Sequence, residues 1–343
     1  MALIYALLLL WLALTGSFEG WYQLPLLWLN GLASALILLR WAWLLKRGQP
    51  WRSLSLPLLI YLLVALVATL ITPGDGLINW YYRLVLVALY HVADPDIEEL
   101  GRGAYWAGWI VTPLALLFPW ENGNSLAFVL WGLFFMSLAY KADYRLGFLT
   151  LGIIAFNGSE GGVLAMLAGL LAWAAGRRPG IFWPAFSLAG IVGGAIIIDK
   201  YASASYSFWG RLEIYQSAWS GFLQSPWWGN GLHSFYTVLS NGSQILGQHN
   251  LVLWLLWETG LIGLVIGLWL VISLARSTVP AWTLAWLTAF AAHAMVDNPL
   301  QHSFLVGAVL MLILAGCYGQ KQIYLFANPE LVSAGHSGAA VQP

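Results

Sequence analysis

The chain has 343 residues, of which 60% are hydrophobic and 8% are charged, and its formal net charge is +0. Soluble domains carry about 25% charged residues, so this composition is typical of an integral membrane protein and argues against a soluble enzyme. The neutral balance shows no basic surface for nucleic acid, and the single cysteine, Cys317, excludes an intrachain disulfide framework.

Apolar runs long enough to cross a membrane, roughly 17 to 25 residues, recur along the whole chain. Strand-type alternation is absent, and backbone groups in hydrocarbon must be satisfied within their own segment, so we expect helices rather than a barrel. The first run has the length of a signal-peptide core but no positive residue before it, and we interpret it as an uncleaved span. The predicted fold class is an all-α polytopic helical bundle with about twelve transmembrane helices, near residues 2–18, 24–45, 55–72, 77–93, 103–119, 125–140, 145–158, 161–175, 181–198, 250–273, 280–296 and 303–319.

Lysine and arginine are shared unequally between alternate loops. If the N-terminus is inside, ten of these residues lie in cytoplasmic loops and two, Lys200 and Arg211, lie outside. This positive-inside bias predicts that both termini are cytoplasmic. We expect residues 1–320 to form a single transmembrane domain with an outward loop at 199–249, and residues 321–343 to form a cytoplasmic tail. The ten inner residues are Lys46, Arg47, Arg52, Arg102, Lys141, Arg145, Arg177, Arg178, Arg276 and Lys321.

The outward loop contains a segment with helical periodicity. Leu212, Tyr215, Trp219 and Phe222 recur at helical spacing, and a Ser-Pro step follows them. Such a helix would lie on the outer membrane surface, with Arg211 at the level of the lipid headgroups and Tyr215 one turn away on the same face. Arg211 is then either a functional cation or an interfacial anchor whose charged end reaches water.

The next stretch of the loop, from Pro226 to Gly231, has the composition of a tight turn. Gly229 and Gly231 would allow backbone N–H groups to come close to an anion. The alternative is that this turn only reverses the chain.

His249 and Asn250 stand where the chain re-enters the membrane. An outward-facing imidazole is suited to moving a proton near neutral pH, and Asn250 is a favourable N-cap for the following span. Glu258 lies inside that span, where a carboxylate is costly and needs a partner. Gly260 and Gly263 follow it and would let another helix pack closely.

Further polar residues lie near the outer ends of other spans. Arg83 lies early in a span that starts on the outer side, and an arginine within a membrane is a functional candidate by default. Asp297 and His302 belong to the last outward turn, where Asp297 either orients a histidine or arginine or is part of a solvated turn. The D-x-D pattern at Asp94 and Asp96 has no nucleotide-binding domain around it, and we interpret it as a solvated turn. No zinc-type ligand cluster, Walker motif or Rossmann motif is present.

Taken in order, the loop residues form a longer pattern: R-x-x-x-Y-x-x-A, P-x-x-G-x-G-x-x-x-F, H-N and E-x-G-x-x-G. This pattern resembles the O-antigen ligase and O-antigen polymerase family of membrane glycosyltransferases, and its position between two late spans agrees with that family. The matching residues here are Arg211, Tyr215, Ala218, Pro226, Gly229, Gly231, Phe235, His249, Asn250, Glu258, Gly260 and Gly263.

The resemblance implies a fold and a reaction. Such enzymes are GT-C-like bundles in the bacterial inner membrane, and their active site faces the periplasm. They take a glycan from undecaprenyl pyrophosphate without a nucleotide sugar, a cofactor or a required metal. A ligase passes the glycan to a sugar hydroxyl of lipid A–core, whereas a polymerase passes it to a second lipid-linked glycan.

The family's functional positions correspond to Arg211 and His249. We expect Arg211 to hold the pyrophosphate, because a guanidinium offers several fixed donors to phosphate oxygens. His249 is expected either to take the proton of the attacking hydroxyl or to bind phosphate. The residues expected to bind substrate are Arg83, Tyr215, Gly229, Gly231, Asn250, Asp297 and His302, and those with a structural or undecided role are Glu258 and Glu160.

One position departs from the family. Many members carry a Ser-Arg-Gly step at the start of a middle span, where this chain has Ser159-Glu160-Gly161. The charge is reversed there, so either Arg83 replaces the missing arginine, or the donor or acceptor differs, or the activity has been lost.

Within the family we favour a ligase over a polymerase and over a transferase with a protein acceptor. Outside it, the alternatives are a transporter of lipid-linked sugars and a peptidoglycan glycosyltransferase. A transporter predicts two related halves and a polar central pathway. The H-N and E-x-G-x-x-G patterns argue against the peptidoglycan enzyme.

Overall fold

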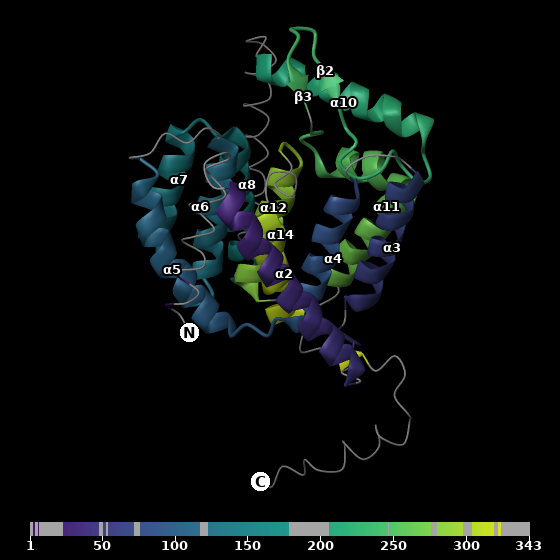
Figure 1. The fold of residues 1–343 in the computed structure, drawn as a ribbon. Helices are drawn as coiled ribbons and strands as arrows, with labels where there is room; N and C mark the ends of the chain where they lie inside the picture. Colours follow the sequence, from purple (N-terminus) through teal and green to yellow (C-terminus); the bar gives the residue numbers. More distant parts are fainter. Residues whose placement is uncertain are drawn as a thin grey trace.

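The computed structural model describes residues 3, 6, 23–47, 51–52, 54–71, 76–116, 123–177, 206–245, 247–275, 280–297, 304–318 and 322–323 (Figure 1). Within these ranges the chain is mostly helical, as the all-α prediction requires. The helices are α2 (Gln23–Lys46), α3 (Ser55–Ile71), α4 (Gly76–Val92), α5 (Ile97–Leu114), α6 (Gly123–Ser137), α7 (Tyr144–Phe156), α8 (Glu160–Arg177), α10 (Tyr206–Gln224), α11 (Leu251–Ala275), α12 (Ala281–Ala294) and α14 (Phe304–Tyr318). The strands, of two residues each, are β1 (Trp51–Arg52), β2 (Thr237–Val238), β3 (Gln244–Ile245) and β4 (Gln322–Ile323).

Helices coincide with ten of the twelve expected spans, and the other two, 2–18 and 181–198, lie wholly or almost wholly outside the described residues. Among the described helices, the stretch Leu251–Ser273 is long and apolar enough to cross a membrane. The stretches Ser55–Ile71, Leu126–Ser137 and Tyr144–Phe156 are apolar but shorter. The helices at these positions are therefore confirmed, whereas the count of twelve spans is not.

The helices form a bundle, and α10 lies across one end of it (Figure 1). In this bundle α8 packs against α12, α6 and α7, while α3 packs against α4 and α11. The helix α10 contacts α11, and β2 and β3 form a small antiparallel hairpin beside it. We call the end of the bundle that α10 covers the α10 end.

An aromatic cluster fills the core where α6 meets α12. Trp131 and Trp286 are both 0% exposed, with ring centroids 5.7 Å apart, and Trp286 stacks on Phe290 at 5.6 Å. The indole N–H of Trp131 donates to Nδ1 of the buried His293 over 3.0 Å. Large aromatic rings in edge and stacked contact form a rigid core. They therefore fix α12, whose last residue leads into the α10 end.

The end of the bundle opposite α10 is tied together by short contacts. The strands β1 and β4 pair antiparallel, with Arg52 opposite Gln322, and Arg52 donates to the Tyr90 carbonyl over 2.7 Å. The expected tail at 321–343 therefore includes a strand at 322–323, and its other residues lie outside the described part of the chain.

The D-x-D pattern serves as a helix cap. The Asp96 carboxylate accepts hydrogen bonds from the backbone N–H groups of Glu98 and Glu99, at 3.0 and 3.1 Å, at the start of α5. An aspartate at this position satisfies N–H groups that have no partner within the helix. This agrees with the interpretation of a solvated turn.

Glycines let α8 approach its neighbours closely. A Cβ at Gly169 would lie 2.2 Å from Phe135 Cζ and 3.0 Å from the Ala285 carbonyl oxygen. A Cβ at Gly162 would lie 2.3 Å from that of Ala127. Small residues at helix interfaces are a common feature of membrane bundles.

We predict that Gly169→Ala lowers the unfolding temperature in detergent. The methyl group would overpack the interface at a cost of about 1–3 kcal/mol, which exceeds the gain of about 1 kcal/mol from the helix propensity of alanine. Gly152→Ala on α7 is the matched control, because a Cβ there meets nothing within 4 Å. Equal unfolding temperatures for the two variants would contradict this packing.

Candidate active site

The helix α10 is held on the bundle by one apolar face. Ile214, Ala218 and Phe222, one turn apart, are 3%, 1% and 5% exposed. The first two belong to a cluster with Phe235, and residues of α11 pack against that cluster. The buried stripe follows the series that starts at Ile214, whereas Trp219 and Leu223 are 48% and 59% exposed. One face of α10 therefore meets protein, and the location of α10 on the membrane surface stays a prediction.

The hairpin of β2 and β3 is tied to α10 by one carboxylate. Glu213 accepts hydrogen bonds from the backbone N–H and the hydroxyl of Ser240, at 2.8 and 2.7 Å. These bonds favour the charged form and hold the pKa of Glu213 below its ordinary value. They fix the hairpin on the exposed side of α10.

Arg211 and Tyr215 lie one turn apart on α10. The Tyr215 hydroxyl lies 3.5 Å from the Met295 carbonyl oxygen, in the turn after α12. Burial raises the pKa of the Tyr215 phenol, which also senses the charges of Arg211 and Asp297. Arg211 is half-buried, and it forms no ion pair with any residue that the structure describes. A cation of this kind is suited to an anionic ligand.

His249 and Asp297 form a hydrogen-bonded pair at the α10 end. Nδ1 of His249 lies 2.8 Å from Oδ1 of Asp297, and the two side chains are 27% and 3% exposed. A buried carboxylate requires such a partner, while the imidazole keeps part of its surface open. The expectation that Asp297 orients a histidine agrees with this geometry. His302, expected in the same turn, lies outside the described residues.

Asn250 joins the start of α11 to the end of α12. Its Oδ1 accepts from the N–H groups of Val252 and Leu253 at 3.0 and 3.1 Å, and its Nδ2 donates to the Met295 carbonyl over 2.8 Å. The expected N-cap is confirmed. Because Asn250 adjoins His249 and Met295 lies close to Asp297, the cap also fixes the spacing of that hydrogen-bonded pair.

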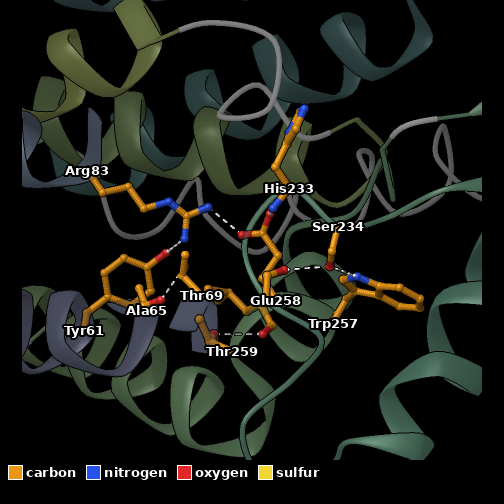
Figure 2. Close-up of polar contacts among 11 residues, drawn as sticks. Tyr61, Ala65, Thr69, Arg83, His233, Ser234, Trp257, Glu258 and Thr259 are labelled. Atoms are coloured by element: carbon orange, nitrogen blue, oxygen red, sulfur yellow. Dashed lines mark hydrogen bonds and ion pairs between the residues drawn. The ribbon is translucent and has the colours of Figure 1, made fainter. Parts of the chain in front are cut away.

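Arg83 and Glu258 form an ion pair between α4 and α11 (Figure 2). The guanidinium donates to Oε2 of Glu258 at 2.5 Å and to the Tyr61 hydroxyl at 2.5 Å, and it lies 4.7 Å from the centroid of the Trp254 ring. The two charged side chains are 14% and 5% exposed. Glu258 therefore has the partner that its position in an apolar helix requires, and Arg83 supplies it. A role of Arg83 in substrate binding stays a prediction.

The helix α11 is broken at Gly260, where φ is 64° and ψ is −161°. Backbone from the glycine-rich turn lies at the break: Leu261 N–H donates to the Pro226 carbonyl over 2.8 Å. A Cβ at Gly260 would lie 2.3 Å from the Trp227 carbonyl oxygen. Gly260 was expected to permit close packing of another helix, but the segment that packs closely against it is the glycine-rich turn.

The glycine-rich turn presents its N–H groups to α11. Those of Asn230 and Gly231 donate to the carbonyls of Trp257 and Glu258 at 2.5 and 3.2 Å, and that of Gly229 donates to Ser225 within the turn. Gly229 and Gly231 have φ values of 74° and 88°. The N–H groups that were expected to face an anion thus have carbonyl acceptors. In this geometry the turn is a structural joint, because its hydrogen bonds connect the segment after α10 to both halves of α11.

Sequence reasoning missed His233, which follows this turn. Its backbone N–H donates to Oε1 of Glu258 over 2.8 Å, its φ is 55°, and its side chain is exposed. The only signal in the sequence was a histidine inside the P-x-x-G-x-G-x-x-x-F pattern. Neither the left-handed backbone nor the contact with Glu258 follows from that pattern.

Glu160 begins α8 and is half-buried. Beside it, the Ser159 hydroxyl accepts from the Gly162 N–H at 3.1 Å and donates to Asn124 at 2.7 Å. A Cβ at Gly161 would lie 2.7 Å from the Val296 side chain. The start of α8 therefore lies against the turn that carries Asp297, at the same end of the bundle as His249.

These groups give the α10 end a defined chemistry. A guanidinium suits an anion, and an imidazole whose Nδ1–H donates to a carboxylate has its lone pair on Nε2, where it can take a proton. Within the described ranges, no group of three or more His, Cys, Asp and Glu side chains is placed to hold a metal ion.

Comparison with known proteins agrees with the family resemblance that the motifs indicate. Residues 146–268 match the family model described as O-antigen ligase. An O-antigen ligase of Pseudomonas aeruginosa is 30% identical over 182 residues. The resemblance to the O-antigen ligase family is confirmed. The aligned region covers 48% of this chain and 45% of the Pseudomonas protein, so the chain matches about half of that relative's length.

The O-antigen ligase match includes the outward loop and the first part of α11. It contains Arg211, His249, Glu258 and Glu160, whereas Arg83 lies before it. Asp297 lies after it. The two side-chain pairs therefore join the matched region to helices on both sides of it. No solved structure matches the chain.

We predict strong coupling between Arg83 and Glu258 in a double-mutant cycle. Arg83→Leu or Glu258→Leu alone leaves a buried charge unpaired and is expected to cost about 3–5 kcal/mol. The double variant should lose less than the sum of the two, as measured by unfolding in detergent. A cycle on the surface pair Arg102 and Glu98, whose side chains are 38% and 67% exposed, is the control and should show coupling of about 0–1 kcal/mol. Additive losses at Arg83 and Glu258 would contradict the pair.

Proposed function

We propose that this chain is an O-antigen ligase-like glycosyltransferase of the bacterial inner membrane. It moves a glycan from undecaprenyl pyrophosphate to a sugar hydroxyl of lipid A–core at the periplasmic face. The observation that supports this most is the His249–Asp297 pair, which lies beside the Arg211 helix within a chain that matches the O-antigen ligase model. The α10 end would then face the periplasm, and both termini would be cytoplasmic.

The leaving group is a lipid pyrophosphate, so negative charge grows on a phosphate oxygen as the bond to the sugar breaks. Arg211 has no carboxylate partner among the described residues, and its guanidinium would bind those oxygens and stabilise the charge. Tyr215, one turn along α10, would hold the same group or the first sugar.

The proton of the acceptor needs a base. In the proposed step the acceptor oxygen attacks the anomeric carbon, the bond between that carbon and the phosphate oxygen breaks, and the bonding electron pair leaves with the pyrophosphate. The hydroxyl proton passes to Nε2 of His249. Asp297, which accepts from Nδ1, would orient the ring and stabilise the imidazolium that forms. This step uses no metal and no nucleotide cofactor.

A polymerase would use the same donor and the same residues with a second lipid-linked glycan as acceptor. The family model and the Pseudomonas relative are both described as O-antigen ligases, and this favours the ligase. The test of function is a transfer assay with purified protein, undecaprenyl-pyrophosphate glycan and lipid A–core. Glycan on lipid A–core supports the ligase, whereas longer lipid-linked chains without that acceptor support the polymerase. Absence of both products with folded protein would contradict the proposal.

In this assay we predict that Arg211→Ala and His249→Ala each lower transfer by at least about 100-fold, because they remove charge stabilisation and the base. Arg211→Ala should change the unfolding temperature little, whereas His249→Ala leaves the buried Asp297 carboxylate without this partner and should lower it, so transfer is compared at equal amounts of folded protein. Gln216→Ala, an exposed position on α10, is the control and should keep full activity. Full activity in either of the first two variants would show that the site lies elsewhere.

We also predict that Asp297→Asn lowers kcat by at least about tenfold while the KM for the donor changes little. An amide has nearly the same shape but offers no negative charge to the imidazolium. Asp96→Asn is the matched control, since asparagine caps a helix as well as aspartate does and α5 starts far from this site. An unchanged kcat for Asp297→Asn would mean that the carboxylate only supports the fold.

A further inference from the structure

Two residues other than glycine have a positive φ in the described part of the chain, and both are histidines: His249 at 51° and His233 at 55°. A side chain with a Cβ is strained in this conformation, and such strain persists where the surroundings enforce it. His249 already has a place in the proposed site. His233 has none, so we asked what holds it and what its side chain reaches.

The backbone at His233 is held by the buried Glu258 carboxylate. Oε1 of Glu258 accepts from the His233 N–H at 2.8 Å, while Oε2 binds Arg83 (Figure 2). On the next residue, the Ser234 hydroxyl accepts from the indole N–H of Trp257 at 2.8 Å. A hydrogen bond to a charged acceptor is stronger than one between neutral groups. The Arg83–Glu258 pair therefore fixes the left-handed conformation of His233.

The imidazole of His233 takes no part in this packing. The side chains near it do take part: Leu232 and Phe235 are buried, each 3% exposed, and the Asn230 side chain donates to the Gly221 carbonyl at 3.1 Å. By contrast His233 is exposed, and its imidazole points away from Glu258 in Figure 2. Glycine would fit this position without strain, so the fold alone gives no reason for a histidine.

The surroundings of His233 match an amphiphilic ligand. A Cβ at Gly76, the first residue of α4, would lie 3.3 Å from the carbonyl oxygen of Leu232, so the residue before His233 touches the start of α4. Next to that start Leu77 and Ile78 are 54% and 59% exposed, and Leu70, near the end of α3, is 67% exposed. A polar imidazole beside exposed apolar side chains is the arrangement that a membrane lipid with an anionic headgroup would recognise.

We propose that His233 binds a phosphate group of a membrane lipid substrate, and that Glu258, held by Arg83, is its positioning residue. This rests on the proposed function for the identity of the lipid. Two sources supply the same chemistry: the pyrophosphate of the undecaprenyl donor and the phosphates of the lipid A–core acceptor. The imidazole would donate to a phosphate oxygen at the membrane surface, with the lipid chain along the exposed residues of α3 and α4.

The test is lipid binding by the full chain in nanodiscs, with undecaprenyl pyrophosphate, phosphate-free undecaprenol and lipid A–core as probes. His233→Gly removes the imidazole, keeps the N–H bonded to Glu258 and relieves the strain, so its unfolding temperature should stay equal or rise. Binding of one phosphorylated probe should weaken by about tenfold, as expected for one lost charge-assisted hydrogen bond, while binding of undecaprenol stays unchanged. The control Gln224→Ala, at an exposed position on α10, should bind as the parent does.

The probe whose binding weakens shows which lipid supplies the phosphate. Weaker binding of undecaprenyl pyrophosphate indicates the donor, and weaker binding of lipid A–core indicates the acceptor. His233→Asn tolerates the same backbone and lacks the imidazole, so it should repeat the loss even if His233→Gly folds poorly. Glu258→Gln keeps the acceptor oxygen but loses the charge, and it should weaken the same probe less than His233→Gly does. Lipid binding that both His233 variants retain, or a parent chain that binds neither phosphorylated lipid, would overturn the proposal.

These outcomes separate the proposal from the proposed function. Loss of transfer in Arg211→Ala together with unchanged binding in His233→Gly would leave the ligase proposal standing and remove this one. Weakened binding in His233→Gly, with a parent chain that transfers no glycan, would leave the phosphate contact standing and remove the ligase.

Discussion

A helix in an apolar medium must satisfy every backbone group internally, and α11 breaks this rule at Gly260. The break is possible because the turn from Pro226 to Gly231 supplies the missing partners: its carbonyls accept from the second half of α11 and its N–H groups donate to the first half. An unpaired backbone group there would cost several kcal/mol. The joint therefore locks the segment that follows α10 to the bundle, and the positions of α10 and Arg211 depend on it.

Two side-chain pairs, Arg83 with Glu258 and His249 with Asp297, extend this joint in different directions. Glu258 lies beside the break and binds Arg83 on α4, so the turn is tied to the half of the bundle that contains α3 and α4. His249, at the start of the same helix, binds Asp297 after α12 and ties the loop to the other half. Both carboxylates are buried and both partners approach from a separate helix or turn. The loop is thus held at two points, and one of them contains His249, which is proposed to act on a lipid-linked glycan.

The sequence predicted the features that depend on composition or local spacing. Apolar runs marked the helices because lipid requires them, and Asn250 followed by an apolar run indicated a cap. The need of Glu258 for a partner also followed from its place in a span. The sequence did not identify Arg83 as that partner, since the two residues are separated by 175 positions and other arginines were equally available. Gly260 permits both close packing and a positive φ, and only the fold decides between them. The sequence did not show which apolar side chains of α10 pack on protein, because Trp219 and Ile214 fit helical spacing equally well.

The measurement that tests the account most directly is a structure of the chain with undecaprenyl pyrophosphate bound. The account predicts the pyrophosphate within about 3 Å of the Arg211 guanidinium, with the His249–Asp297 pair intact beside the anomeric position and the turn at Gly260 unchanged. A pyrophosphate bound away from Arg211, or bound only after α11 closes into a continuous helix, would contradict it.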